Sequence, residues 1–142
     1  MPATHTHTLT RRVEFSDTDL AGIMHFSNFF RFMESVEHDF YRTLGLKLTR
    51  QMPDGSTLGW PRVNASCEYK RPLKFEDLVD VTLKVAKKTG KAITYDFIFC
   101  KRGETEECAR GSLTIVCCAF RDGKLQATLL PKEWDEKIEL CS

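Results

Sequence analysis

Hydrophobic and polar residues alternate over several short runs of the chain, a pattern that predicts β-strands with one buried face. The runs span residues 9–15, 63–69, 79–85, 93–99, 113–119 and 125–130. Asp122-Gly123, just before the last run, is a typical β-hairpin turn. Because every run keeps a polar face, we expect an antiparallel sheet that buries only one side.

One segment follows a different period. Between Asn28 and Leu44 the apolar residues recur at steps of three and four, which predicts a single long helix. They are Phe29, Met33, Val36, Phe40 and Leu44, whereas Arg31, Glu34, Glu37, His38 and Arg42 occupy the other faces. Ser27 or Asn28 can cap the start of this helix, and Gly45 is typical of a helix end.

The order of the elements, one strand, one long helix and then a meander of strands, favours an α+β fold. We expect the sheet to wrap around the helix. The length of 142 residues fits a single domain over residues 1–142. An N-terminal tail is expected at about 1–7, with His5 and His7 frayed. Residues 47–59 show little periodicity and are expected to form one long loop.

The composition is that of a globular protein, with 42% hydrophobic and 29% charged residues. A net charge of +1 argues against a general nucleic-acid-binding protein, which needs a clear basic excess. No apolar run approaches the roughly 20 residues that cross a bilayer, and the N-terminus lacks the apolar core of a signal peptide. We therefore expect a cytoplasmic protein without a membrane span, whose six cysteines are reduced and bind no metal.

Residues 14–25, between the first strand and the helix, carry the candidate chemistry: Asp17, Asp19, Gly22 and His25. The first N–H groups of a helix have no partner within it and carry partial positive charge, so they can stabilise an oxyanion. A carboxylate just before them supplies a nucleophile or a general base. Gly22 marks a bend, and Asp17 is more typical of a turn or a cap.

Several short motifs of the chain occur together in one known family. They are Asp17-Thr18-Asp19 with Gly22-Ile23, a helix that begins near Ser27-Asn28-Phe29, Glu34, Tyr69-Lys70-Arg71-Pro72 and Phe75-Glu76-Asp77. Residues 8–130 thereby resemble the hotdog-fold acyl-CoA thioesterases, in particular the 4-hydroxybenzoyl-CoA thioesterase type and its Tol–Pal-associated relatives. The resemblance implies an antiparallel sheet wrapped around one long central helix. It also implies hydrolysis of an acyl-CoA substrate to a free acid and coenzyme A.

The same resemblance implies roles for residues before and at the start of the helix. Asp19 attacks the thioester carbonyl as a nucleophile or positions water as a general base, and no metal or organic cofactor is needed. The carbonyl oxygen points at backbone N–H groups around His25 and Phe26, with Gly22 and Asn28 beside the substrate. Many relatives carry Tyr and then His at the third and fourth positions after the glycine, where this chain has His25 and Phe26.

Basic residues are candidates for binding the phosphates of coenzyme A. Lys87, Lys88 and Lys91 surround a turn whose side chains and N–H groups suit phosphate, and a solvated lysine-rich hairpin is the alternative. In the resembling enzymes such residues commonly reach across from a neighbouring subunit, and Arg71 is a similar candidate. A wrapped sheet leaves strand edges open, so we expect a homo-oligomer, either a dimer or a dimer of dimers.

Two other functions stay open on the sequence. A hotdog hydratase or dehydratase needs an Asp/His or His/Glu pair at other spacings, which the interval from Asp19 to His25 does not fit well. A non-catalytic acyl-CoA-binding protein would share the fold and never release coenzyme A. Glu34 can face the site or pair with Arg31 or His38. The acyl group is not defined by the sequence.

Overall fold

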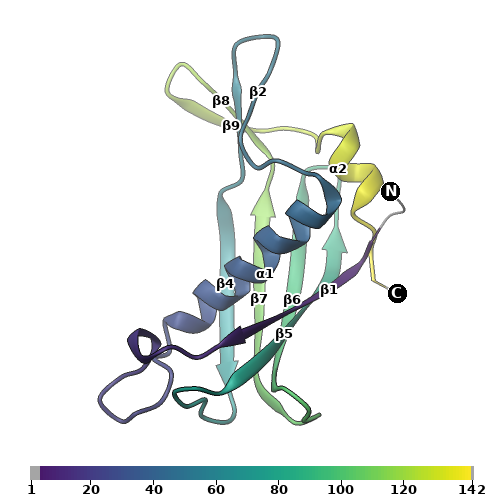
Figure 1. Cartoon of the computed structure of the whole chain (residues 1–142). Coiled ribbons are helices and arrows are strands. Elements are labelled where there is room, and N and C mark those ends of the chain that lie inside the picture. Colours follow the sequence, from purple (N-terminus) through teal and green to yellow (C-terminus); the bar gives the residue numbers. More distant parts are fainter. Residues whose placement is uncertain (1–3, 142) are drawn as a thin grey trace.

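The computed structural model describes residues 4–141, which form two antiparallel sheets, one long helix and one short helix (Figure 1). The large sheet has the order β1 (Thr6–Arg12), β5 (Leu78–Lys88), β6 (Ala92–Lys101), β7 (Glu107–Val116) and β4 (Arg62–Tyr69). The small sheet has the order β2 (Arg50–Gln51), β3 (Thr57–Gly59), β8 (Cys118–Arg121) and β9 (Lys124–Ala127). The helices are α1 (Asn28–Leu44) and α2 (Lys132–Lys137), and a 3-10 turn, η1 (Phe15–Asp17), follows β1.

Helix α1 lies across one face of the large sheet, and its apolar stripe forms much of the core (Figure 1). It spans the predicted residues and ends at Gly45, whose φ of 72° is left-handed. Gly111 on β7 allows the helix to approach the sheet closely, because a Cβ atom at this position would lie 2.1 Å from the Cε of Met33. The predicted α+β fold, with an antiparallel sheet wrapped around one long helix, is confirmed.

The small sheet projects from one end of the large sheet (Figure 1) and corrects two predictions. Residues 47–59, predicted as a loop, contain β2 and β3, which are too short for an alternating pattern to reveal. The run at 113–119 forms two strands rather than one, because the chain leaves β6 after Val116 and pairs with β3 instead. The predicted hairpin is confirmed, and both Asp122 and Gly123 have positive φ.

The N-terminal segment is bound to the fold from Thr4 onward, which shortens the tail predicted at about 1–7. Residues 1–3 lie outside the described residues. The backbone of Thr4 makes hydrogen bonds to the segment that follows α2 and to the end of α2 itself. His7, expected in a frayed tail, lies on β1 and bonds to Asp39 of α1 through Nε2 at 2.7 Å. Thr4 and His7 are held by hydrogen bonds to residues far along the chain, and a local sequence pattern does not reveal such contacts.

Strand β4 lies at the edge of the large sheet opposite β1, and no other strand among residues 4–141 pairs with its outer side. Seven of its eight residues are exposed, whereas β5 and β6 bury about every second residue. The alternation at 63–69 predicted a half-buried strand, but among the residues of β4 Cys67 alone is partly buried within this chain. An edge strand with exposed apolar side chains such as Val63 is suited to pairing with another chain.

Candidate active site

The backbone between β1 and α1 is folded around Asp17. Its Oδ2 accepts a hydrogen bond from the N–H of Glu14 at 2.8 Å, which closes the turn η1. Its carbonyl oxygen accepts hydrogen bonds from the N–H of His25 and from Nδ2 of Asn28, both at 2.8 Å. Asp17 is therefore the turn and capping residue that the sequence indicated, and it ties the start of α1 to this turn.

Asp19 lies in a tight loop that its own carboxylate stabilises. Its Oδ1 accepts hydrogen bonds from the N–H groups of Ala21 at 2.9 Å and Ile23 at 3.4 Å. The N–H of Gly22 donates to the carbonyl of Asp19, and the φ of +80° at Gly22 favours glycine. Asp19 is half-buried, and its Oδ2 makes no hydrogen bond to any residue between 4 and 141. One carboxylate oxygen thus fixes the loop and the other stays available.

A cavity of about 440 Å³ opens beside Asp19. Its walls come from the Asp19 loop, the start of α1 and the end of β4 with the residues that follow it. They consist of Asp19, Ile23, Met24, Phe26, Phe29, Tyr69, Lys70, Arg71 and Pro72. The rings of Phe29 and Tyr69 meet edge to face, with centroids 4.9 Å apart. The cavity joins three predicted site residues, Asp19, Phe26 and Arg71, on a largely apolar wall.

The backbone N–H groups at the start of α1 are not equivalent. The N–H of His25 donates to Asp17, and the N–H of Ser27 donates to Nδ1 of His25 at 3.3 Å. The N–H of Phe26 takes part in no hydrogen bond within residues 4–141. The His25 carbonyl accepts from the N–H of Asn28 at 2.9 Å, and in a trans peptide the next N–H points the opposite way. The Phe26 N–H is therefore directed away from the helix and is free to bind an oxyanion.

The side chains of His25 and Asn28 stabilise the start of the helix and do not line the cavity. Nδ1 of His25 lies 2.7 Å from the hydroxyl of Ser27 and accepts from the N–H of the same residue. The imidazole packs against the ring of Phe26, with centroids 4.5 Å apart. Asn28 is buried and directs its amide to the carbonyl of Asp17. The roles predicted for both residues next to the substrate thus have no direct geometric support.

The rim of the cavity carries basic side chains that acidic neighbours neutralise. The half-exposed Arg71 forms an ion pair with Glu106. Nζ of Lys70 lies 2.8 Å from Glu107, which also pairs with Arg110. The hydrogen bonds from Arg110 and Lys70 lower the pKa of Glu107 to about 2. An anionic substrate group would therefore compete with carboxylates for these two cavity cations.

The predicted phosphate-binding lysines lie at the other end of the sheet from Asp19. They belong to the hairpin between β5 and β6, whereas β1 leads into the Asp19 loop beside Leu78 at the opposite end of β5. The length of β5 separates the two ends by about 33 Å. Lys88 is also engaged within its own chain, since Nζ donates to the carbonyls of Asp135 at 2.6 Å and Ile138 at 2.8 Å. Lys87 and Lys91 stay exposed.

A second cavity, of about 280 Å³, contains a charge cluster that the sequence did not predict. Glu37, expected on a polar helix face, is 2% exposed and accepts hydrogen bonds from Arg62 at 2.7 and 3.0 Å. Glu34 pairs with the same guanidinium at 3.0 Å, rather than with Arg31 or His38. The hydrogen bonds that Arg62 donates to Glu37 and Glu34 raise the pKa of Arg62. No local signal could have revealed this cluster, because Arg62 arrives from β4, far along the chain.

An antiparallel sheet wrapped around a long helix defines the hotdog fold, and here a carboxylate loop precedes the start of that helix. The chain belongs to the thioesterase-like superfamily, whose sequence profile matches residues 13–138. The family and the hydrolase class predicted from the sequence are confirmed by this match.

Individual relatives agree with this assignment. A protein of Aquifex aeolicus (strain VF5), provisionally named an esterase, is 33% identical over 123 residues, which cover 87% of this chain and 90% of that protein. The 4-hydroxybenzoyl-CoA thioesterase of Pseudomonas sp. (strain CBS-3) is 25% identical and covers 95% of this chain and 96% of its own. The crystal structure of a 1,4-dihydroxy-2-naphthoyl-CoA thioesterase from Synechocystis superposes with a TM-score of 0.82 at 24% identity, over 92% and 93% of the two chains. This last likeness establishes the fold.

Neither helix among residues 4–141 has the length and apolar character to span a bilayer. No group of three or more His, Cys, Asp or Glu side chains in the same range is arranged to hold a metal ion.

Proposed function

We propose that this protein hydrolyses acyl-CoA thioesters to a free acid and coenzyme A in the cavity beside Asp19. The observation that supports this most directly is a juxtaposition of an available carboxylate oxygen and an available N–H. Oδ2 of Asp19 and the N–H of Phe26 are both free of hydrogen bonds within residues 4–141, and both residues line the same cavity. Acyl transfer needs a nucleophile or base together with an oxyanion donor.

The proposed reaction begins with the thioester carbonyl oxygen at the Phe26 N–H. Negative charge that develops on this oxygen is stabilised by the N–H and by the partial positive charge at the start of α1. One such donor is worth about 3 kcal/mol. The proposed chemistry uses groups of the chain itself and invokes no metal or organic cofactor.

Asp19 can act in hydrolysis by two routes, as a nucleophile or as a general base. In the first, Oδ2 attacks the carbonyl carbon, the C–S bond breaks, and coenzyme A leaves as a thiolate that takes a proton from solvent. Water then cleaves the resulting anhydride and regenerates the carboxylate. In the second, Asp19 accepts a proton from a water molecule that attacks the carbonyl directly, and this proton passes to the departing sulfur. Both routes yield one acid and one thiol.

We assign the acyl group to the aromatic class. The rings of Phe26, Phe29 and Tyr69 line the cavity next to Asp19, and stacked or edge-on contacts suit an aroyl group. The Pseudomonas relative is named for an aromatic acyl group with a hydroxyl substituent. The Synechocystis protein that shares the fold is also named for a hydroxylated aromatic acyl group.

The proposal includes a homodimer that pairs β4 with β4 of a second copy. Within one chain, Tyr69 of β4 lies at the Asp19 end, whereas Arg62 lies at the same end as the hairpin of Lys87 and Lys91. Antiparallel pairing reverses the ends, so the partner's lysine hairpin would move to the Asp19 end of the first chain. This arrangement supplies cations for the phosphates of coenzyme A from across the interface, and two such dimers can associate further.

We place this activity in the cytoplasm. The cysteines, all six within the described residues, are free thiols, which suits a reducing compartment.

The proposed function is tested by mixing the protein with a panel of acyl-CoAs from acetyl to long-chain and aromatic, and following thiol release with a thiol-reactive dye. Fastest release from the aromatic members is expected. Tight binding without thiol release would instead identify an acyl-CoA-binding protein. A parallel assay with crotonyl-CoA should show no loss of enoyl absorbance, and such a loss would favour the hydratase alternative.

A further inference from the structure

We propose that Tyr69 is a positioning residue that holds the Phe26 N–H in the orientation needed to bind the oxyanion. This inference rests on the proposed function. The hydroxyl of Tyr69 donates a hydrogen bond to the carbonyl oxygen of Phe26 at 3.1 Å, from a residue 43 positions away in the chain. Neither the sequence motif nor the fold assigns a role to this hydroxyl.

The Tyr69 hydroxyl fixes one of the two peptide groups that flank Phe26. The preceding peptide is held by the hydrogen bond from the N–H of Asn28 to the carbonyl of His25. In the following peptide, the carbonyl of Phe26 accepts a long bond of 3.4 Å from the N–H of Phe29, and the N–H of Ser27 donates to Nδ1 of His25 at 3.3 Å. At that length the intrahelical bond is weak, so the Tyr69 hydroxyl is the closer partner of this carbonyl. The Phe26 N–H belongs to the first of these two peptides, and the Tyr69 bond restrains rotation about the backbone bonds of Phe26 that join it to the second.

Tyr69 is itself firmly placed at the end of β4. The two residues that follow it, Lys70 and Arg71, donate their N–H groups to the carbonyl of Cys108 on β7 at 2.9 and 3.0 Å. Its ring packs edge to face on Phe29, the first buried aromatic residue of α1. The hydroxyl therefore connects the sheet to the first turn of the helix. Partial burial raises the pKa of Tyr69, so the hydroxyl keeps its proton, and its ability to donate, at neutral pH.

A fixed donor matters because oxyanion stabilisation depends on geometry. A donor serves catalysis when it is already aimed at the position that the oxyanion occupies in the transition state. Loss of the Tyr69 hydroxyl should leave the substrate able to bind, while the Phe26 N–H samples other directions. The expected effect is on kcat and not on KM.

The test compares two variants that each remove one tyrosine hydroxyl. Tyr69→Phe should lower kcat for an aroyl-CoA by about tenfold, with KM unchanged within about twofold and the same melting temperature. Tyr41→Phe is the matched control, because the Tyr41 hydroxyl bonds to that of Tyr95 at 2.9 Å in the core, away from the cavity. This control should melt at a lower temperature and keep its kcat.

A spectroscopic measurement separates positioning from simple loss of stability. An aroyl-CoA labelled with ¹³C at the thioester carbonyl is bound to Asp19→Asn, and the carbonyl stretch is recorded by difference infrared spectroscopy. Hydrogen bonding to the Phe26 N–H should shift this band to lower frequency, and adding Tyr69→Phe should reduce the shift. An unchanged shift together with an unchanged kcat would overturn the role of Tyr69. A change confined to KM would overturn it too, since it would identify a substrate contact.

The two proposals fail in distinguishable ways. If the wild-type protein releases no coenzyme A from any acyl-CoA, the proposed function is wrong and the role of Tyr69 falls with it. If turnover requires Asp19 but Tyr69→Phe keeps full kcat, only the positioning role is wrong.

Discussion

The N–H of His25 donates a hydrogen bond of 2.8 Å to the carbonyl oxygen of Asp17. This pairing removes His25 from the backbone donors expected at the start of the helix, whereas the N–H of Phe26 has no hydrogen-bond partner among residues 4–141. The same carbonyl oxygen accepts the side-chain amide of Asn28. A single backbone oxygen of the turn therefore holds the geometry of the helix start, and the site depends on it.

Replacing Asn28 with alanine should destabilise the protein by about 1 kcal/mol, because a buried hydrogen bond to Asp17 is lost. Urea unfolding followed by circular dichroism measures this change. Gln126→Ala is a suitable control, since Gln126 is an exposed amide on β9. A midpoint for Asn28→Ala equal to that of the control would show that this bond does not stabilise the helix start.

The pair of Glu37 and Arg62 should behave as a buried ion pair. Arg62→Met leaves the Glu37 carboxylate, 2% exposed, without its partner, and a loss of about 3–5 kcal/mol is expected. Glu37→Leu combined with Arg62→Met should recover most of this loss, because no buried charge remains. Equilibrium unfolding of the three proteins forms the test, and a double variant as unstable as Arg62→Met would contradict it.

Stability should fall at acid pH partly through Glu107. The folded pKa of this residue is lowered from 4.5 to about 2 by hydrogen bonds from Arg110 and Lys70. A lowered folded pKa stabilises the protein above the unfolded value, and this contribution is lost as the pH falls from about 4.5 towards 2. Glu107→Gln should therefore show a shallower decrease of melting temperature over this interval. Parallel pH profiles for the variant and the wild type would exclude the effect.

The sequence predicted the parts of the fold that local patterns determine. The apolar stripe defines the helix from Asn28 to Leu44, and the turn chemistry of Asp122-Gly123 defines the last hairpin. Contacts between distant residues could not be predicted in the same way. Glu37 looked like a surface residue because nothing near it in sequence indicates that Arg62 covers it.

In the candidate site, too, the features that a local motif determines could be predicted, whereas the contacts between distant residues could not. Asp19 and the turn role of Asp17 follow from a motif of a few residues, and both lie where that motif indicated. The hydrogen bond from Tyr69 joins β4 to the helix start and depends on the packing of the whole sheet. The N–H of His25 is already hydrogen-bonded to Asp17 because of the backbone conformation of the turn, and side-chain patterns do not define that conformation.

Pairing through β4 predicts a dimer that depends on the exposed face of that edge strand. Lysine on an edge strand blocks pairing with another strand, so Val63→Lys combined with Ala65→Lys should yield monomers. Because Lys87 and Lys91 would then no longer reach a neighbouring site, KM for acyl-CoA should rise. Sedimentation velocity and steady-state kinetics measure the two effects. A wild-type protein that sediments only as a monomer at micromolar concentration would contradict the shared site.

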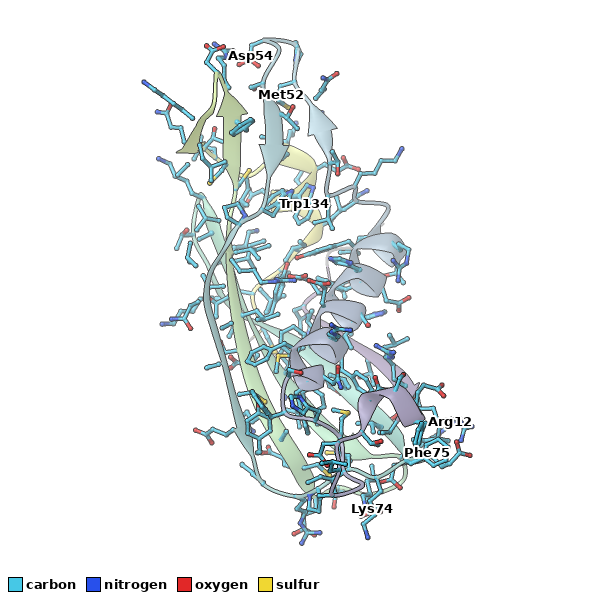
Figure 2. All side chains as sticks on the ribbon, turned by 90° about the vertical axis from the view of Figure 1, so that its left-hand side faces the viewer. Arg12, Met52, Asp54, Lys74, Phe75 and Trp134 are labelled. Carbon is cyan, nitrogen blue, oxygen red and sulfur yellow. The ribbon has the colours of Figure 1, made fainter. Side chains whose placement is uncertain are left out.

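The most direct test of the proposed function is the turnover of Asp19→Asn on an aroyl-CoA that the wild type hydrolyses. The substitution keeps an acceptor for the N–H groups of Ala21 and Ile23, so the fold and melting temperature should be retained. Asp54→Asn serves as the control, since Asp54 caps a turn at the opposite end of the molecule from Lys74 and Phe75, which lie near the Asp19 end (Figure 2). Turnover should fall at least about 100-fold in Asp19→Asn and stay unchanged in Asp54→Asn. Undiminished thiol release by a folded Asp19→Asn variant would contradict the assignment of this cavity as the active site.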